Sequence, residues 1–258
     1  MRFLFRICPA ITALALSLAP AAQAQILVET SNETRFQIDL KVADAALKTY
    51  LPEGFTSAAA TQGPAKDCNL RVVFIDRISI KAPDGKPLGK GSNRLVYLVA
   101  PVKDPSGASV QLVIGGLTQD PADVPGPFGN YLLATTHDMT RFTEAGVAGP
   151  KVETQDWTFA AKSGEHLELH ITFQQGDGTQ SKPADVKFYS AKNPTYYQIS
   201  HQEQALDILR NTTTNPPDRV KQFSLKTSGG SYDKLFDNTV QVLSWDNIPS
   251  INRTISTP

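Results

Sequence analysis

Short segments with strand-like patterns follow one another along this 258-residue chain, separated by turn residues. Residues 34–42 show the pattern most clearly, because apolar and polar side chains alternate as in a strand with one buried face. Turn-forming residues such as Pro83-Asp84-Gly85 lie between the segments. So many short strands predict an all-β fold, either an antiparallel barrel or a sandwich. The other predicted strands are residues 70–80, 94–102, 110–114, 151–160, 166–173, 186–189, 196–200, 220–225 and 240–245.

Only a few short helices are expected. Residues 44–51 can form two helical turns, and residues 203–210 are the second candidate. No stretch is rich enough in Pro, Gly or Ser to be a linker, so residues 25–258 are predicted to form a single domain. The most irregular loop, residues 118–129, holds three prolines and two glycines. Long loops on a β scaffold often line a binding site, although a solvated crossover explains this loop equally well.

Residues 1–24 have the pattern of a secretion signal. An apolar segment covers residues 7–20, and Ala22-Gln23-Ala24 supplies the small residues that cleavage before Gln25 requires. The apolar segment is shorter than the roughly 20 residues that a membrane span needs. We therefore expect a cleaved signal peptide, no membrane span, and a periplasmic or secreted bacterial protein, with an uncleaved anchor as the alternative.

The charge balance limits the classes of partner that the chain can bind, and the cysteine content limits its disulfides. The chain has 25 basic and 25 acidic residues, and removal of residues 1–24, which hold Arg2 and Arg6, leaves 23 basic and 25 acidic. This balance argues against nucleic acid or an anionic membrane as a partner and leaves a small-molecule ligand. After cleavage Cys68 is the only cysteine, so no disulfide can form within the chain. No nucleotide-binding motif is present, and we predict no cofactor.

Asp76 is unusual within its strand, because alternation places its carboxylate on the same face as Leu70, Val72 and Phe74. A carboxylate among apolar side chains is costly unless it is paired. Arg94 opens the next long strand and is a suitable partner. We predict Asp76 and Arg94 as a catalytic acid–base or substrate-anchoring pair. The alternative is a bulge after Ile75 that turns Asp76 outward.

A possible metal site is formed by His166, Glu168 and His170, which share one face of a strand. However, Thr172 and Gln174 continue the same polar face, so a solvated outer face explains the pattern without a metal. We therefore predict no metal site, and whether these three side chains face a pocket or solvent is left open.

Residues 47–55, Leu-Lys-Thr-Tyr-Leu-Pro-Glu-Gly-Phe, resemble the opening segment of the acetoacetate decarboxylase-like family. The strands at residues 71–76 and 94–102 and the segment Gly126-Pro-Phe-Gly-Asn-Tyr131 fit the same family. The resemblance implies a closed antiparallel β-barrel with a largely apolar internal cavity. It also places Phe128 within the site segment. We assign Tyr97, Phe128 and Tyr131 to substrate binding, with ordinary packing as the alternative.

The chain departs from the family where the chemistry is expected. Family decarboxylases form a Schiff base on a lysine just after the aromatic–glycine step, whereas this chain has Leu132 and Leu133 there and no lysine between Asp104 and Pro150. The family's glutamate before the apolar strand is Arg94 here. We therefore predict an exported protein that binds a small carbonyl or carboxylate compound without Schiff-base chemistry, and leave open whether it also converts that compound. The alternative is a non-catalytic secreted β-sandwich, a binding or structural module.

Overall fold

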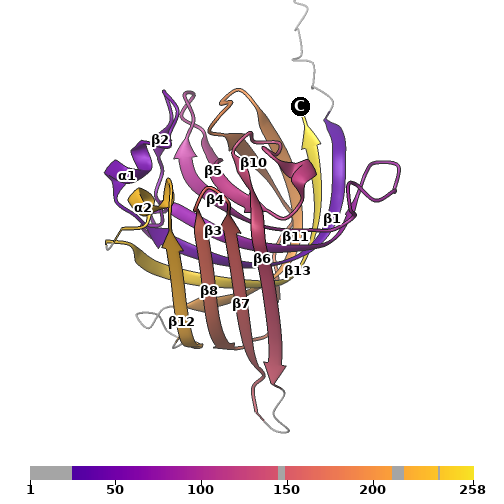
Figure 1. Cartoon of the computed structure of the whole chain (residues 1–258), viewed down its shortest axis with the longest axis vertical. Helices are drawn as coiled ribbons and strands as arrows, with labels where there is room; N and C mark the ends of the chain where they lie inside the picture. The colour runs from indigo at the N-terminus through magenta and orange to yellow at the C-terminus, as the bar shows by residue number, and fades with distance from the viewer. Residues whose placement is uncertain (1–24, 145–148, 211–217, 238) are drawn as a thin grey trace, which may run out of the picture.

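The computed structural model describes four stretches of the chain, residues 25–144, 149–210, 218–237 and 239–258. Nearly all of its elements are strands (Figure 1). The helices are short: α1 (Asp44–Lys48), α2 (Tyr232–Leu235) and a 3-10 turn, η1 (Pro121–Asp123). In these four stretches, no helix has the length and apolar character needed to cross a bilayer. The predicted all-β class is confirmed. The signal peptide predicted at residues 1–24 lies outside the described residues.

Seven strands form a ring in which each strand pairs with the next and the last pairs with the first. In ring order they are β1 (Ile26–Lys41), β3 (Leu70–Lys81), β4 (Asn93–Lys103), β5 (Ser109–Thr118), β10 (Ala184–Ser190), β11 (Tyr197–Arg210) and β13 (Gln241–Thr257). Neighbours pair antiparallel except β10 and β5, which run parallel where Phe188, Tyr189 and Ser190 meet Gln111, Leu112 and Val113. Two short strands extend the ring, β2 (Thr56–Ser57) on β4 and β9 (Thr179–Gln180) on β11.

The remaining four strands branch from the ring as a second layer. They are β6 (Tyr131–Glu144), β7 (Val152–Ala161), β8 (His166–Gln174) and β12 (Val220–Ser228). The branch begins at β6, whose first residues pair parallel with the end of β5. Figure 1 shows these four strands running side by side, across the direction of β1, β3 and β13. This layer covers one side of the ring.

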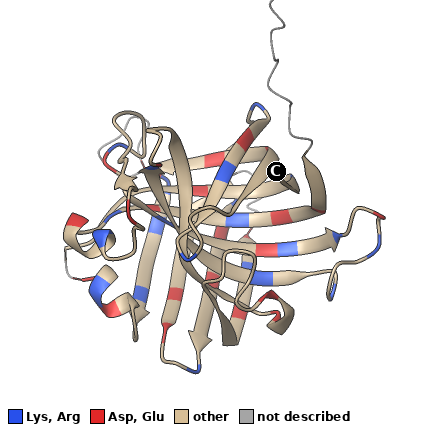
Figure 2. Ribbon diagram, turned by 90° about the horizontal axis from the view of Figure 1, so that it is seen from above, with Lys and Arg blue, Asp and Glu red and all other residues tan. Residues whose placement is uncertain are grey.

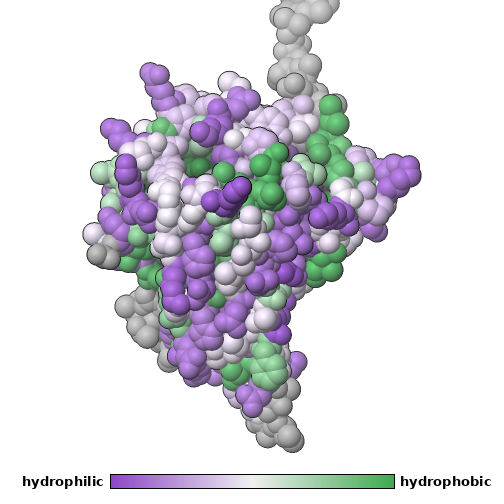
Figure 3. Space-filling model, in the orientation of Figure 1, coloured by the Kyte–Doolittle hydropathy of each residue, from purple (hydrophilic) through white to green (hydrophobic). Residues whose placement is uncertain are grey.

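The main apolar core lies between the ring and the second layer. Phe36 of β1 contacts Phe173 of β8 with ring centroids 5.9 Å apart, and Phe74 of β3 contacts Trp157 of β7 at 5.8 Å. All four of these aromatic side chains are fully buried. The outer face drawn in Figure 3 is mostly hydrophilic, with hydrophobic atoms in small groups. The alternating apolar face of residues 34–42 is therefore the face that packs outward, against the second layer.

The opposite faces of the ring strands point into the ring. On β1 this inner face carries polar side chains, including the buried Glu33 and Arg35, whereas β3 and β4 contribute Val73, Ile75 and Tyr97. Figure 2 shows acidic and basic bands side by side on neighbouring strands. The interior thus has an apolar side and a charged side.

The prediction of a helix at residues 203–210 is wrong, because these residues belong to β11. Glu203, Ala205 and Leu209 favour a helix locally, but β11 pairs with β13 along almost its whole length. Tertiary pairing therefore overrides local propensity here. Strand β13 also continues twelve residues beyond the predicted end at Trp245, to Thr257.

Candidate functional site

A cavity of about 70 Å³ lies inside the ring, and we call it the first chamber. All seven ring strands contribute lining side chains, from Glu29 on β1 to Arg253 on β13. The irregular loop at residues 118–129 adds Asp123, Pro127 and Phe128. This loop therefore lines the cavity, which was one of its two predicted roles.

One wall of the first chamber is aromatic. Tyr97, Phe128, Tyr131 and Phe188 line it together with Ile75. Tyr97 and Phe188 meet edge to face with centroids 6.4 Å apart, and Phe128 meets Tyr131 in the same way at 6.2 Å. Such a wall suits the hydrocarbon part of a small ligand.

Two glycines fix the ring of Tyr131. A β-carbon at Gly116 would come within 2.9 Å of the tyrosine ring, and one at Gly126 within 2.6 Å. Gly126 also has a positive φ of 73°, which side-chain-bearing residues rarely adopt. Burial raises the pKa of Tyr131 far above its usual value, so its hydroxyl stays protonated and can donate a hydrogen bond.

On its charged side the first chamber is lined by Arg77 and Arg253, and both pair with the buried Glu33 behind them. Its carboxylate pairs with Arg35 at 2.6 Å, Arg253 at 2.7 Å and Arg77 at 3.2 Å. Glu29 pairs with Arg77 and, at 3.4 Å, with Arg253. Burial alone would raise the pKa of Glu33, but the guanidinium groups of Arg253, Arg35 and Arg77 lower it well below its usual range. Glu33 therefore stays ionised.

This cluster carries an excess positive charge, because three guanidinium groups face two carboxylates. Arg253 pairs with both carboxylates and yet keeps one nitrogen without a partner. Burial lowers its pKa, and the like charges of Arg77 and Arg35 add to the effect against the attraction of Glu33. Its Nε atom is buried and has no hydrogen-bond partner among the described residues. A ligand carboxylate would supply an acceptor for this nitrogen.

Asp123 brings a further carboxyl group to the first chamber. Asn93 donates a hydrogen bond to it, and η1 positions it at the start of the irregular loop. Burial raises its pKa, with nearby Asp120 and Glu29 adding to the rise and Arg77 opposing it. A carboxyl group with a raised pKa beside a cavity is suited to accept and return a proton.

The structure brings Tyr97, Phe128 and Tyr131 together at the first chamber, but not Asp76 and Arg94. Strand alternation points Ile75 and Arg77 inward and Asp76 outward, toward the second layer. There Asp76 pairs with Arg94 at 3.4 Å. The register of β1 on β3 shifts at Ile78 rather than after Ile75.

Arg94 also donates a hydrogen bond of 3.0 Å to the backbone carbonyl of His137 on β6. The Asp76–Arg94 pair thus ties the ring to the second layer. A catalytic role for this pair stays a prediction, and the position of the two residues gives it no support.

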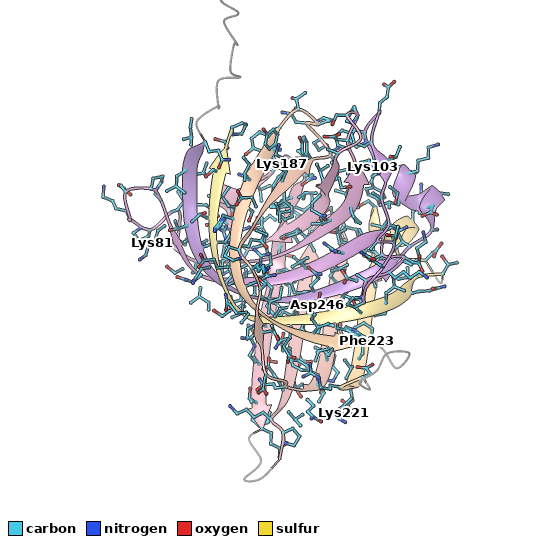
Figure 4. The ribbon with its side chains drawn as sticks, turned by 180° about the vertical axis from the view of Figure 1, so that it is seen from behind. Lys81, Lys103, Lys187, Lys221, Phe223 and Asp246 are labelled. Atoms are coloured by element: carbon cyan, nitrogen blue, oxygen red, sulfur yellow. The ribbon has the colours of Figure 1, made fainter. Side chains whose placement is uncertain are left out.

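Lysine is missing from the first chamber, as the departure from the family pattern predicts. None of the lysines in the described stretches is buried. Lys81, Lys103, Lys187 and Lys221, labelled in Figure 4, are all exposed. Leu132 packs against the main core and Leu133 is exposed, so neither residue after the aromatic–glycine step faces the cavity.

Two of the three side chains considered for a metal, Glu168 and His170, have other partners. Glu168 pairs with Lys226 at 2.6 Å, and His170 pairs with Asp156 at 2.7 Å. Both pairs lie on the partly exposed face of the second layer. Across the described stretches, no three His, Cys, Asp or Glu side chains gather closely enough to hold a metal ion.

Sequence reasoning missed Glu29, Glu33, Arg77 and Arg253 as site residues. A signal was present in β1, where polar side chains occupy every second position from Glu29 to Lys41 and most of them are charged, with both signs. A long strand with such a face indicates paired buried charges when both faces are covered.

The architecture is thus an all-β ring of strands around an aromatic and charged cavity. Comparison with solved structures places the fold more closely. The enduracididine biosynthesis enzyme MppR, solved in complex with pyruvate, matches with a TM-score of 0.58 and 15% identity over 96% of each chain. An acetoacetate decarboxylase-like enzyme from Sphingomonas wittichii RW1 matches at 0.53 and 12% identity, over 93% of this chain and 97% of the other. Acetoacetate decarboxylase from Legionella pneumophila matches at 0.51 and 13% identity, over 96% of each chain.

This chain therefore has the acetoacetate decarboxylase-like fold, as its sequence resemblance predicted. No protein-family model and no curated protein matches the chain. Identities of 12–15% fit a divergent sequence on a shared fold.

Proposed function

We propose that this protein is exported and binds a small carboxylate compound that carries a carbonyl group. The ligand is held in the first chamber without a covalent bond. The observation that carries the proposal is the buried Nε of Arg253, which has no hydrogen-bond partner among the described residues and lies opposite an aromatic wall in a chamber without lysine.

Size and chemistry agree with this ligand class. Because one water needs roughly 10–15 Å³ of such volume, a chamber of 70 Å³ has room for about five to seven non-hydrogen atoms. Arg253 would pair with the carboxylate, and the Tyr131 hydroxyl would donate to the carbonyl oxygen. MppR, which shares the fold, was solved with pyruvate, a compound of this size and type.

Isothermal titration with pyruvate tests the proposal. Arg253→Gln is expected to weaken binding about tenfold or more, because a hydrogen bond to a charged group is lost. Arg94→Gln is the matched control, since it removes an ion-paired arginine from the opposite face of the same sheet. Circular dichroism verifies that both variants fold. Equal weakening by both variants, or no binding of pyruvate or its close 2-oxo acid analogues to the parent protein, would contradict the proposal.

Borohydride reduction in the presence of pyruvate tests the absence of a Schiff base. We expect no mass increase, because no lysine lines the first chamber. A reduced adduct on any lysine would show that covalent chemistry occurs.

Conversion by proton transfer is a second candidate function, favoured by the position of Asp123 on the chamber wall. Its carboxylate would take a proton from the carbon beside the carbonyl, and Tyr131 would stabilise the enolate oxygen. The same carboxyl group then returns a proton to that carbon. In deuterated water, NMR is expected to show faster exchange of the pyruvate methyl protons with the parent protein than with Asp123→Asn. Binding without any difference in exchange between the two proteins would leave a binding protein and exclude this step.

A further inference from the structure

A second cavity of about 250 Å³ lies inside the same ring, and we call it the second chamber. All seven ring strands line it too, but at other positions along their length. Tyr97 and Phe188 line both chambers. Their edge-to-face contact, at 6.4 Å between centroids, therefore stands at the boundary between the two.

The second chamber is rich in glutamine. Gln37, Gln111, Gln202 and Gln204 line it from three different strands, β1, β5 and β11. A glutamine amide can donate and accept hydrogen bonds at once, which suits hydroxyl groups that do the same. Four such amides around one cavity offer a ligand several hydrogen bonds without a net charge.

Gln111 gives an independent indication of a ligand. Its Oε1 atom is buried and has no hydrogen-bond partner among the described residues. A buried acceptor without a donor costs free energy, so a ligand hydroxyl that donates to it would be stabilising. By contrast, Gln37 already donates to Asp39 and Asp246, each at 3.2 Å.

Both arginines of the second chamber are ion-paired. Arg71 pairs with the buried Asp39 at 3.0 Å, and Arg35 pairs with Glu33 at 2.6 Å. Among the described residues, neither of these two guanidinium groups has a buried nitrogen without a hydrogen-bond partner, as Arg253 has. The site is therefore suited to a neutral ligand, unlike the first chamber.

The remaining lining is apolar, with Val73, Val99 and Ile248 beside the rings of Tyr97 and Phe188. Aromatic rings pack against the C–H faces of a sugar ring, while amides bond its hydroxyl groups. We propose that the second chamber is a separate binding site for a neutral polyhydroxylated compound, a sugar or cyclic polyol. This inference does not depend on the proposed function of the first chamber.

Saturation-transfer NMR with D-glucose, D-ribose and myo-inositol tests the inference. Gln111→Leu is expected to bind about tenfold more weakly, because it removes the unpartnered acceptor while keeping the side-chain size. This variant should fold at least as stably as the parent, since the orphaned oxygen is gone. Gln241→Leu, at an exposed position on β13, is the control and should bind as the parent does.

Two results would overturn the inference: no binding of any of the three probes to the parent protein, or equal binding by Gln111→Leu. The variant Arg253→Gln separates the two sites, because it should lose pyruvate and keep the sugar. If sugar binding fell with Arg253→Gln and not with Gln111→Leu, the sugar would lie in the first chamber. Failure of pyruvate to bind would leave the sugar result unaffected.

Discussion

At the scale of single residues, Glu33 holds the interior charges together. It is buried, and its two oxygens contact three guanidinium groups from three positions on β1, β3 and β13. Removing this carboxylate would leave like charges facing each other in a place where water cannot screen them.

Glu33→Gln is therefore expected to destabilise the protein by roughly 3–5 kcal/mol at neutral pH, measured by urea denaturation. Glu168→Gln, which removes a carboxylate from a partly exposed pair with Lys226, is the control and should change stability by less than about 1 kcal/mol. The effect also depends on pH. Because the folded pKa of Glu33 is lowered, its contribution is present above the unfolded value of about 4.3 and is lost as pH falls toward the folded value. A similar loss from both variants would contradict this role.

Asp76 and Arg94 are each about one quarter exposed, and their pair lies outside both chambers. We expect Asp76→Asn to leave pyruvate binding unchanged and to lower the free energy of unfolding by about 1 kcal/mol or less. Titration calorimetry and urea denaturation measure the two effects. A large loss of binding would restore the pair as site residues.

Tyr97, Phe128 and Tyr131 line the first chamber and could be chosen from the sequence, because hydroxyl and aromatic groups occurred where a family resemblance placed the site. Their role in substrate binding stays a prediction. By contrast, the sequence pattern could not identify Glu29, Arg77 and Arg253 as residues that line the cavity. Strand alternation shows that a strand has two faces, but only the closing of the ring decides which face points inward.

At the scale of elements, β1 and β11 illustrate when the alternation of apolar and polar residues predicts a strand and when it does not. Residues 34–41 of β1 alternate without a break, so the strand was predicted with both of its faces. Residues 203–210 of β11 do not alternate in this way, and their partner β13 is far away in the sequence. Local propensity therefore favoured a helix at these residues, whereas pairing with β13 stabilises them as a strand.

The contact between the ring and the second layer depends on aromatic packing. Phe74→Ala is expected to destabilise the protein by about 3–5 kcal/mol, because its ring is fully buried against Trp157 and Phe159. Phe142→Ala on β6 is the control: this side chain is 66% exposed, and its loss should change stability by about 0.5 kcal/mol or less. Thermal denaturation measures both. Equal shifts would mean that the two layers are not coupled through Phe74.

At the scale of the whole molecule, the all-β class followed from the number of short strands, and the ring followed from the family resemblance. The division of the interior into a charged chamber and a glutamine-rich chamber did not follow from either. It depends on seven strands that meet only after folding, so no local pattern contains it.

We also propose that the protein is exported and that residues 1–24 are removed during export. When residues 1–258 are expressed in a Gram-negative bacterium, the protein should appear in the periplasm with Gln25 as its first residue, as mass spectrometry would show. Ala24→Leu replaces the small residue before the cleavage point and should yield an uncleaved chain. Recovery of the uncleaved parent protein from the cytoplasm would contradict export.

The parallel joint between β10 and β5 has a mechanical consequence. Phe188, Tyr189 and Ser190 are its only paired residues on β10, whereas β4 stays joined to β5 from Leu95 to Lys103. The shortest pairing between two strands of the ring should open most easily. Backbone amides at the β5–β10 pairing should therefore exchange with deuterium before those of the other strand pairs. Transient separation of β5 and β10 would widen the ring of strands beside Phe188. Solutes could then enter and leave the interior while the other strand pairs stay hydrogen-bonded.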